Sequence, residues 1–276
     1  MDINIELFRN KLQLQRYSEN SIRSYLNCIQ QLNKFFKDYR PEEISIELID
    51  RHVQWLIEDK EISKSYQKQI LIAVQKYFDL VVNLKLDLSK IYPKHQDIHL
   101  PNCISKINIK AMIENTQNLK HKTILCLMYS GGLRPNELLN LTINDIDTQN
   151  CTINIKQAKD KKNRTVMCSD TLREMLPRYY EKYKPKHFVF EGQNGLAYTE
   201  KSLQQVVKLA AIRAGINFPV TPLCLRHSFA THLIDNGTDI HYVQELLGHQ
   251  SIKTTEIYTH TSDVSNTKIK SPLDLL

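Results

Sequence analysis

The first ninety or so residues show one repeating pattern: apolar side chains recur three or four positions apart, which is the period of an α-helix. Ser18 is a suitable N-cap for one such helix. The apolar residues that follow it at helical spacing are Ile22, Tyr25, Leu26, Ile29, Leu32 and Phe36. Similar patterns cover residues 7–14, residues 49–57 and residues from about 65 to 81. Residues 1–92 are therefore predicted to form a domain of four helices.

This pattern is interrupted in residues 91–104, IYPKHQDIHLPNCI, which contain two prolines and have no clear period. Proline removes a backbone donor and ends helices. We therefore place a linker at residues 93–104 and a second domain at residues 105–276. A helical pattern resumes near Ile107 and runs to Tyr129, which predicts a single helix that ends at Gly131-Gly132.

A strand pattern appears in the middle of this second domain. Cys151, Ile153 and Ile155 alternate with polar residues, as in a half-buried strand. Residues 143–147 and 164–167 are its predicted partners, and helical patterns return after them. The predicted fold class is mainly α (α+β), with a four-helix N-terminal domain and a mixed helical domain that contains a small three-stranded antiparallel sheet.

Composition narrows the class of protein. No apolar run approaches the roughly 20 residues that span a bilayer, and the N-terminus lacks the apolar stretch of a signal peptide, so we expect a cytoplasmic protein. The six cysteines are scattered, without a CxxC pair or zinc-ligand spacing, so we expect reduced thiols and no metal site. The net charge of +7 favours a polyanionic partner. Five basic residues crowd into nine positions: Lys156, Lys159, Lys161, Lys162 and Arg164.

Four short segments carry residues with catalytic potential. They are Gly132-Leu133-Arg134-Pro135-Asn136-Glu137-Leu138, Leu225-Arg226-His227-Ser228-Phe229-Ala230-Thr231-His232, Leu246-Leu247-Gly248-His249 and Thr254-Thr255-Glu256-Ile257-Tyr258-Thr259-His260. Each alone is modest evidence, because an arginine at a helix start is usually a surface residue and a late tyrosine usually packs. Their order and spacing are more specific, with Tyr258 nine residues after His249.

In this order and spacing the chain resembles the tyrosine recombinases, also called the phage integrase family. The resemblance extends over nearly the whole chain. The helical N-terminal region is similar to the family's core-binding domain, and residues 18–25, SENSIRSY, fit its usual pattern. The last six residues, SPLDLL, are similar to the tails of integrase-like members from bacterial mobile elements.

The resemblance implies a role for each matching residue. Arg134 and Arg226 would hold the non-bridging oxygens of a phosphodiester and stabilise charge in the transition state. His249 would hydrogen-bond the scissile phosphate. Tyr258 would attack the phosphorus and form a 3′-phosphotyrosyl bond. Glu137 is expected to support Arg134 or the local helix rather than to act on substrate.

A lysine in a β-hairpin completes the family's set, as the general acid that protonates the departing 5′-oxygen. Lys159 matches its position, because residues 158–164, AKDKKNR, resemble the family's G-K-G-x-K-x-R hairpin. Both glycines of that hairpin are replaced here. Lys161 and Lys162 are therefore the alternatives for the general acid, and otherwise they would contact phosphates.

One position departs from the family's pattern. Thr221-Pro222 is usually followed by a histidine three residues before the arginine, but Leu223 stands there in this chain. Leucine cannot accept a proton, so cleavage is expected to be slower than usual. His227 follows Arg226 directly and would point about 100° away from it on a helix. It is therefore interpreted as a structural histidine.

The leading hypothesis from the sequence is a site-specific recombinase or integrase. It would act on double-stranded DNA at specific target sites as a homo-tetramer, with Arg134, Lys159, Arg226, His249 and Tyr258 as its catalytic residues and with no metal or other cofactor. Two alternatives remain. One is a catalytically weakened DNA-binding protein of the same fold, and the other is a topoisomerase-like enzyme that relaxes DNA.

Overall fold

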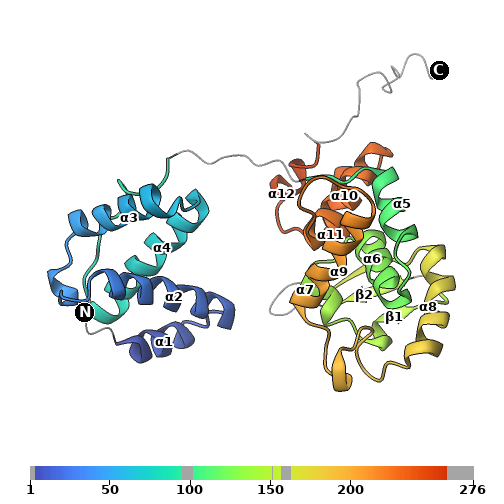
Figure 1. The fold of residues 1–276 in the computed structure, drawn as a ribbon, viewed down its shortest axis with the longest axis horizontal. Helices are drawn as coiled ribbons and strands as arrows, with labels where there is room; N and C mark the ends of the chain where they lie inside the picture. The colour runs from blue at the N-terminus through green and yellow to red at the C-terminus, as the bar shows by residue number, and fades with distance from the viewer. Residues whose placement is uncertain (1–3, 95–101, 151, 157–162, 260–276) are drawn as a thin grey trace, which may run out of the picture. The chain divides into compact units, whose positions relative to one another are not determined.

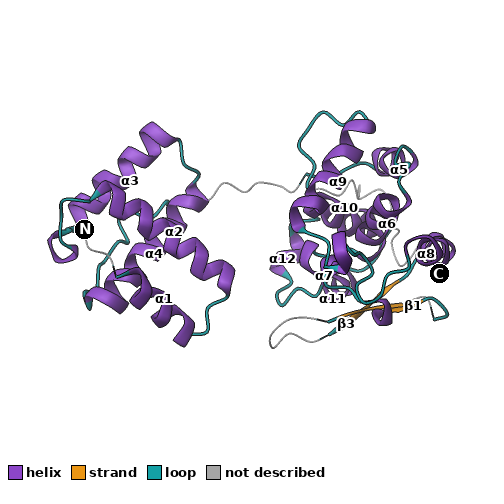
Figure 2. Cartoon of the chain, turned by 60° about the horizontal axis from the view of Figure 1, so that its bottom comes forward, coloured by secondary structure: helices purple, strands orange, loops and turns teal. Residues whose placement is uncertain are grey.

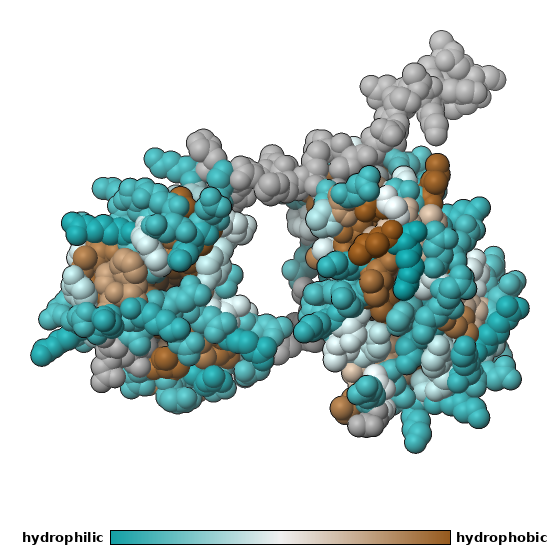
Figure 3. Space-filling view, in the orientation of Figure 1, coloured by the Kyte–Doolittle hydropathy of each residue, from teal (hydrophilic) through white to brown (hydrophobic). Residues whose placement is uncertain are grey.

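The computed structural model describes residues 4–94, 102–150, 152–156 and 163–259. The chain divides into two compact units, Met1–Ile98 and His99–Leu276 (Figure 1). Hydrophilic residues cover most of the visible surface of each unit, with smaller apolar areas between them (Figure 3). None of the helices within the described ranges is long and apolar enough to cross a membrane.

The first unit consists of four α-helices, as the sequence predicted. They are α1 (Ile5–Leu14), α2 (Glu19–Phe35), α3 (Ile46–Lys60) and α4 (Lys64–Tyr77), with a 3₁₀ turn at Pro41–Glu43 and a π turn at Phe78–Val82. Serine side chains cap three of the helices by accepting a hydrogen bond from a backbone N–H of the first turn. Ser18, the cap predicted for α2, accepts from the N–H of Ser21 at 3.2 Å.

An apolar core of its own holds the first unit together. Helix α2 packs on α4, and α1 packs on α2. Phe8 of α1 meets Tyr77 of α4 edge to face, with ring centroids 5.4 Å apart. Both rings are fully buried. Burial of apolar side chains such as these is the main driving force for the folding of a small helical domain.

The second unit combines helices with one small sheet. Its helices are α5 (Lys106–Glu114), α6 (Leu119–Gly131), α7 (Pro135–Leu139), α8 (Asp170–Tyr183), α9 (Glu200–Arg213), α10 (Pro222–Asp235), α11 (Ile240–Leu247) and α12 (Lys253–Glu256), with 3₁₀ turns at Ile143–Asp145 and Gln193–Gly195. The strands are β1 (Ile146–Asp147), β2 (Thr152–Ile155) and β3 (Arg164–Met167). They pair antiparallel in the order β1-β2-β3, at one edge of the unit (Figure 2). The predicted three-stranded antiparallel sheet is confirmed.

Two details of the predicted elements were wrong. The expected helix from Ile107 to Tyr129 is two helices, α5 and α6. The break occurs because the side chain of Asn118 accepts a hydrogen bond from the N–H of His121 at 3.1 Å and so starts a new helix. The first strand is also shorter than expected, because its first three residues form the turn at Ile143–Asp145.

Helices α6 and α10 pack against each other at the centre of the second unit. Gly132 allows this close packing at the end of α6. It has φ +57°, and a Cβ atom placed on it would lie 2.4 Å from the ring of Phe229 on α10. Any side chain at this position would therefore push the two helices apart. The turn at Gly132 leads directly into the segment that carries Arg134.

Candidate active site

Arg134 lies at the N-cap of the short helix α7, directly after the turn at Gly132. Its Nη1 donates to Oε1 of Glu137 at 2.8 Å. Its Nη2 donates to the carbonyl of Gly248, which ends α11, at 3.3 Å. The side chain is 32% exposed. The two hydrogen bonds therefore hold the guanidinium in place, and part of it remains accessible to solvent.

Arg226 lies on α10 and is only 3% exposed. Its Nη1 donates to the carbonyl of Gly132 at 2.7 Å, and its Nη2 donates to the carbonyl of Leu247 at 2.6 Å. Burial, followed by the charge of Arg134, lowers the pKa of Arg226 to about 9. The guanidinium still carries its charge at neutral pH, and it ties α10 to the ends of α6 and α11.

The buried carboxylate of Glu137 contacts three arginines. Its two carboxylate oxygens accept from Nη1 and Nη2 of Arg164, each at 2.7 Å, and from Arg134. Oε2 also lies 3.7 Å from Nη1 of Arg226. Burial alone raises the pKa of this carboxyl. The hydrogen bonds from Arg164 and Arg134 outweigh it and lower the pKa to about 2.

The charges in this cluster do not balance. Three guanidinium groups surround one carboxylate, and the side chains of Arg164, Arg226 and Glu137 are all largely buried. Excess positive charge away from water is unfavourable until an anion neutralises it. A phosphate diester, which offers two non-bridging oxygens to paired N–H donors, has the charge and geometry that this cluster lacks.

His249 follows Gly248 at the end of α11 and lies beside Arg226. Its Nε2 is 3.2 Å from Nη2 of Arg226, and its Nδ1 is 2.9 Å from the hydroxyl of Thr255. A guanidinium can only donate, so Nε2 accepts and Nδ1 carries the proton. Burial, then the charge of Arg226, lowers the pKa of His249 to about 4. The imidazole is therefore neutral at physiological pH.

Tyr258 follows the short helix α12 and is 2% exposed. Its ring packs into an apolar cluster with Phe229, Val243 and Leu247. Its hydroxyl lies 3.0 Å from Nδ1 of His227. Its ring plane is tilted only 19° from that of His249, with centroids 6.3 Å apart. Burial raises the pKa of this phenol, and the charges of Arg226 and Arg134 oppose the rise.

The structure therefore brings together four of the five residues predicted for the site. Arg134, Arg226, His249 and Tyr258 come from segments that span more than 120 positions of the chain, and each contacts another member of the site or Glu137. Lys159 lies outside the described residues.

Two residues of the site make contacts that the sequence did not predict. The sequence places Arg164 in a basic stretch and at the start of a predicted strand, and the structure shows in addition that its guanidinium is buried and bonds Glu137 and the carbonyl of Leu246. His227 was interpreted as structural, but it contacts the hydroxyl of Tyr258. Leu223, in the first turn of α10, is 45% exposed.

Comparisons with known proteins show the family to which the chain belongs. The model of the phage integrase family matches residues 102–264, and the model of the phage integrase N-terminal SAM-like domain matches residues 5–88. The chain is 32% identical to tyrosine recombinase XerA of Pyrococcus horikoshii, over 92% of this chain and 88% of that protein. It is 28% identical to tyrosine recombinase XerD of Staphylococcus epidermidis, over 95% of each.

In fold the chain is similar to a crystal structure of the XerH site-specific recombinase bound to palindromic difH substrate in a post-cleavage complex. That likeness has a TM-score of 0.77 and 23% identity, and covers 93% of this chain and 81% of the other.

Proposed function

Since the chain belongs to the phage integrase family and is a tyrosine-type site-specific recombinase, we propose that the site around Arg226 cuts and rejoins duplex DNA through Tyr258. The observation that carries this proposal is the cluster of three guanidinium groups around Glu137, beside a buried tyrosine. The cluster supplies positive charge for a phosphodiester, and the tyrosine supplies a hydroxyl nucleophile.

The two arginines that were predicted for this role would bind and activate the scissile phosphate. Arg134 and Arg226 would donate to its non-bridging oxygens. The two arginines would give up some of their hydrogen bonds to the carbonyls of Gly248, Gly132 and Leu247. They would form charge-assisted hydrogen bonds to the phosphate instead. Arg164 bonds both oxygens of Glu137 and stays in place as support. Fixed donors of this kind stabilise the charge that develops in the transition state.

The reaction then exchanges one phosphodiester for another. The phenolic oxygen of Tyr258 attacks phosphorus, the bond to the 5′-oxygen breaks, and a 3′-phosphotyrosyl bond retains the energy of the linkage. The 5′-oxygen leaves with a proton, which Lys159 would provide as general acid. We propose that this chemistry uses no metal and no other cofactor.

The partners of the enzyme follow from the same reaction. Strand exchange needs two duplex sites and one active site for each of the four strands, so we propose a homo-tetramer on DNA. We further propose that it works in the cytoplasm. The cysteines of the described ranges are all free thiols, which suits a reducing compartment.

A nicked duplex that carries the target site tests the proposed function. Cleavage next to the nick releases a short fragment by diffusion, so the covalent complex cannot revert and accumulates. We expect a protein–DNA adduct that survives denaturant and forms equally well with a chelator present. A protein that binds this duplex but never forms the adduct would be the catalytically weakened binder that Leu223 suggested.

DNA affinity should depend strongly on salt. Arg23 and Lys34 of α2 and Lys68 of α4 are exposed on the first unit, and they add to the basic residues near β3. Each phosphate contact releases a counterion, so 6–10 contacts lower the affinity by about 10³–10⁵ between 50 and 200 mM salt. Fluorescence anisotropy with labelled duplex measures this slope. A dissociation constant that barely changes over this range would contradict the proposed contacts with the DNA backbone.

We also propose that residues 1–92 and 105–276 are separate domains joined by a linker at 93–104. Each unit has its own buried core, so each should fold alone. Residues 1–94 and 102–276, produced separately, should both show helical circular dichroism and cooperative thermal unfolding. A fragment that unfolds without a cooperative transition would show that the two units depend on each other.

A further inference from the structure

We propose that His227 is a catalytic residue of this enzyme: its Nδ1 accepts the phenolic proton of Tyr258 as the tyrosine oxygen attacks phosphorus. This inference rests on the proposed function. The bond from Tyr258 to phosphorus forms as the bond to the 5′-oxygen breaks. The tyrosine proton moves to His227, and the 5′-oxygen takes its proton from the general acid. In the rejoining step the proton on His227 returns to the phenolic oxygen.

The geometry places a ring nitrogen on the reacting hydroxyl. Nδ1 of His227 lies 3.0 Å from the oxygen of Tyr258, within the range for proton transfer. The two rings have centroids 5.5 Å apart and are tilted by 44°. His227 also follows Arg226 directly on α10, so one turn of helix carries a phosphate ligand and the base for the nucleophile.

The resting protonation states are the ones from which this transfer starts. Burial, then the charge of Arg226, lowers the pKa of His227, so the imidazole is neutral and one of its ring nitrogens is an acceptor. Burial raises the pKa of Tyr258, so the phenol keeps its proton until attack begins. The other histidine beside Tyr258 is His249, whose two ring nitrogens are engaged by Arg226 and Thr255.

The departure at Leu223 leaves this role open for another residue. The resemblance to tyrosine recombinases places a histidine at position 223, but leucine has no group that accepts a proton. Positions 223 and 227 are four residues apart on α10, so they lie on the same face, one turn from each other. His227 therefore presents an imidazole on the face where the usual histidine is missing.

The sharpest test replaces His227 by asparagine and by alanine. The amide of asparagine reaches about as far as Nδ1 of histidine, so His227→Asn can keep a hydrogen bond to Tyr258 but cannot take up its proton. At saturating protein on the nicked duplex, both variants should form the covalent adduct about 10²–10⁴-fold more slowly than the wild type. DNA affinity should stay within a few-fold.

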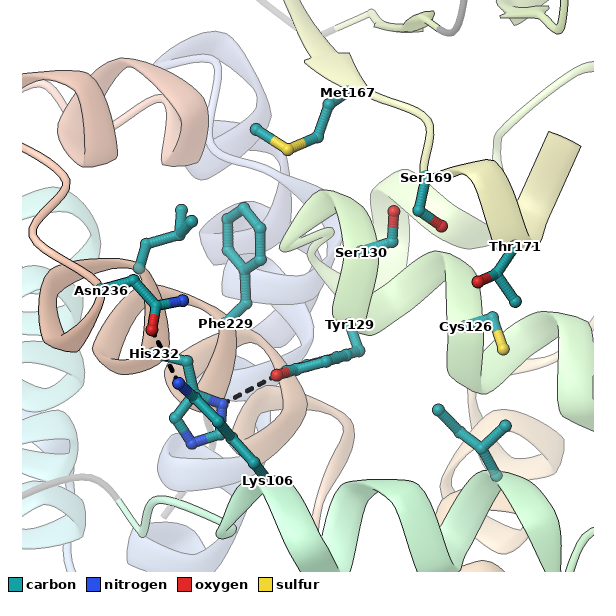
Figure 4. A pocket seen from close by; sticks show the side chains of 12 residues that line it. Lys106, Cys126, Tyr129, Ser130, Met167, Ser169, Thr171, Phe229, His232 and Asn236 are labelled. Carbon is teal, nitrogen blue, oxygen red and sulfur yellow. Dashed lines mark hydrogen bonds between the residues drawn. The ribbon is translucent and has the colours of Figure 1, made fainter.

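His232 provides a matched control on the same helix. Its Nδ1 lies 2.8 Å from the hydroxyl of Tyr129, a pair with the same chemistry that lines a cavity of about 490 Å³ (Figure 4). His232→Asn should form the adduct at the wild-type rate. Equal losses for His232→Asn and His227→Asn would show a general effect of altering α10 and would overturn the assignment.

A second substrate distinguishes the loss of a general base from the loss of a general acid. Sulfur in place of the 5′-oxygen leaves without protonation, so it relieves the need for a general acid and not for a base. His227→Asn should stay slow on this substrate, whereas Lys159→Ala should recover. Near-wild-type cleavage by His227→Asn on the oxygen substrate, or its recovery with sulfur, would overturn the proposal. Absence of any adduct with the wild-type protein would instead contradict the proposed function itself.

Discussion

Tyr258→Phe is expected to abolish the covalent adduct on a nicked duplex while DNA binding is retained. The substitution removes a single oxygen atom, and that atom is the proposed nucleophile. The ring stays in its apolar cluster with Phe229, Val243 and Leu247, so the fold around it is preserved. The lost hydrogen bond to His227 should lower the free energy of unfolding by only about 0.5–1.5 kcal/mol.

Denaturing gels measure the adduct, and anisotropy measures affinity for the same duplex. Tyr129→Phe is the matched control, because it also removes a hydroxyl that is bonded to a histidine of α10. It should form the adduct at the wild-type rate. A persistent adduct with Tyr258→Phe would show that another tyrosine attacks, and Tyr242, which is 65% exposed, would be the next to test.

Helices and strands with one buried face could be predicted from the sequence, because only one period fits their apolar residues. Helix α2 is of this kind. Helix α6 is not, since consecutive residues from Thr123 to Met128 are all buried. A helix that is apolar on every side carries no period, so the break before it at Asn118 was overlooked.

The identity of the site residues could be predicted, but most of their contacts could not. Local patterns place Arg134, Arg226, His249 and Tyr258 in order along the chain. They do not show that Arg164 crosses to Glu137, 27 positions away, because that pairing depends on how β3 packs against the end of α6. The contact between His227 and Tyr258 was missed for a similar reason. The direction of His227 on α10 was judged relative to Arg226, whereas its partner, Tyr258, comes from another segment.

Glu137→Ala is expected to impair both stability and cleavage. The variant leaves the guanidinium groups of Arg134, Arg164 and Arg226 without their shared carboxylate, and two of these side chains are largely buried. Removing one partner of a buried ion pair costs about 3–5 kcal/mol. Urea unfolding should show a loss of this size, and adduct formation should fall because the arginines are no longer held in place.

The pH dependence of stability gives an independent check of this network. The pKa of Glu137 falls from 4.5 to about 2 in the folded protein, so the carboxylate stabilises the fold by about 3 kcal/mol above pH 4.5. That contribution should disappear as the pH falls from about 4.5 to about 2. Glu137→Gln, which is close in size but does not titrate, should lack this part of the acid transition. If the wild type and Glu137→Gln lost stability in parallel over that window, the carboxylate would not be the charge that the three arginines share.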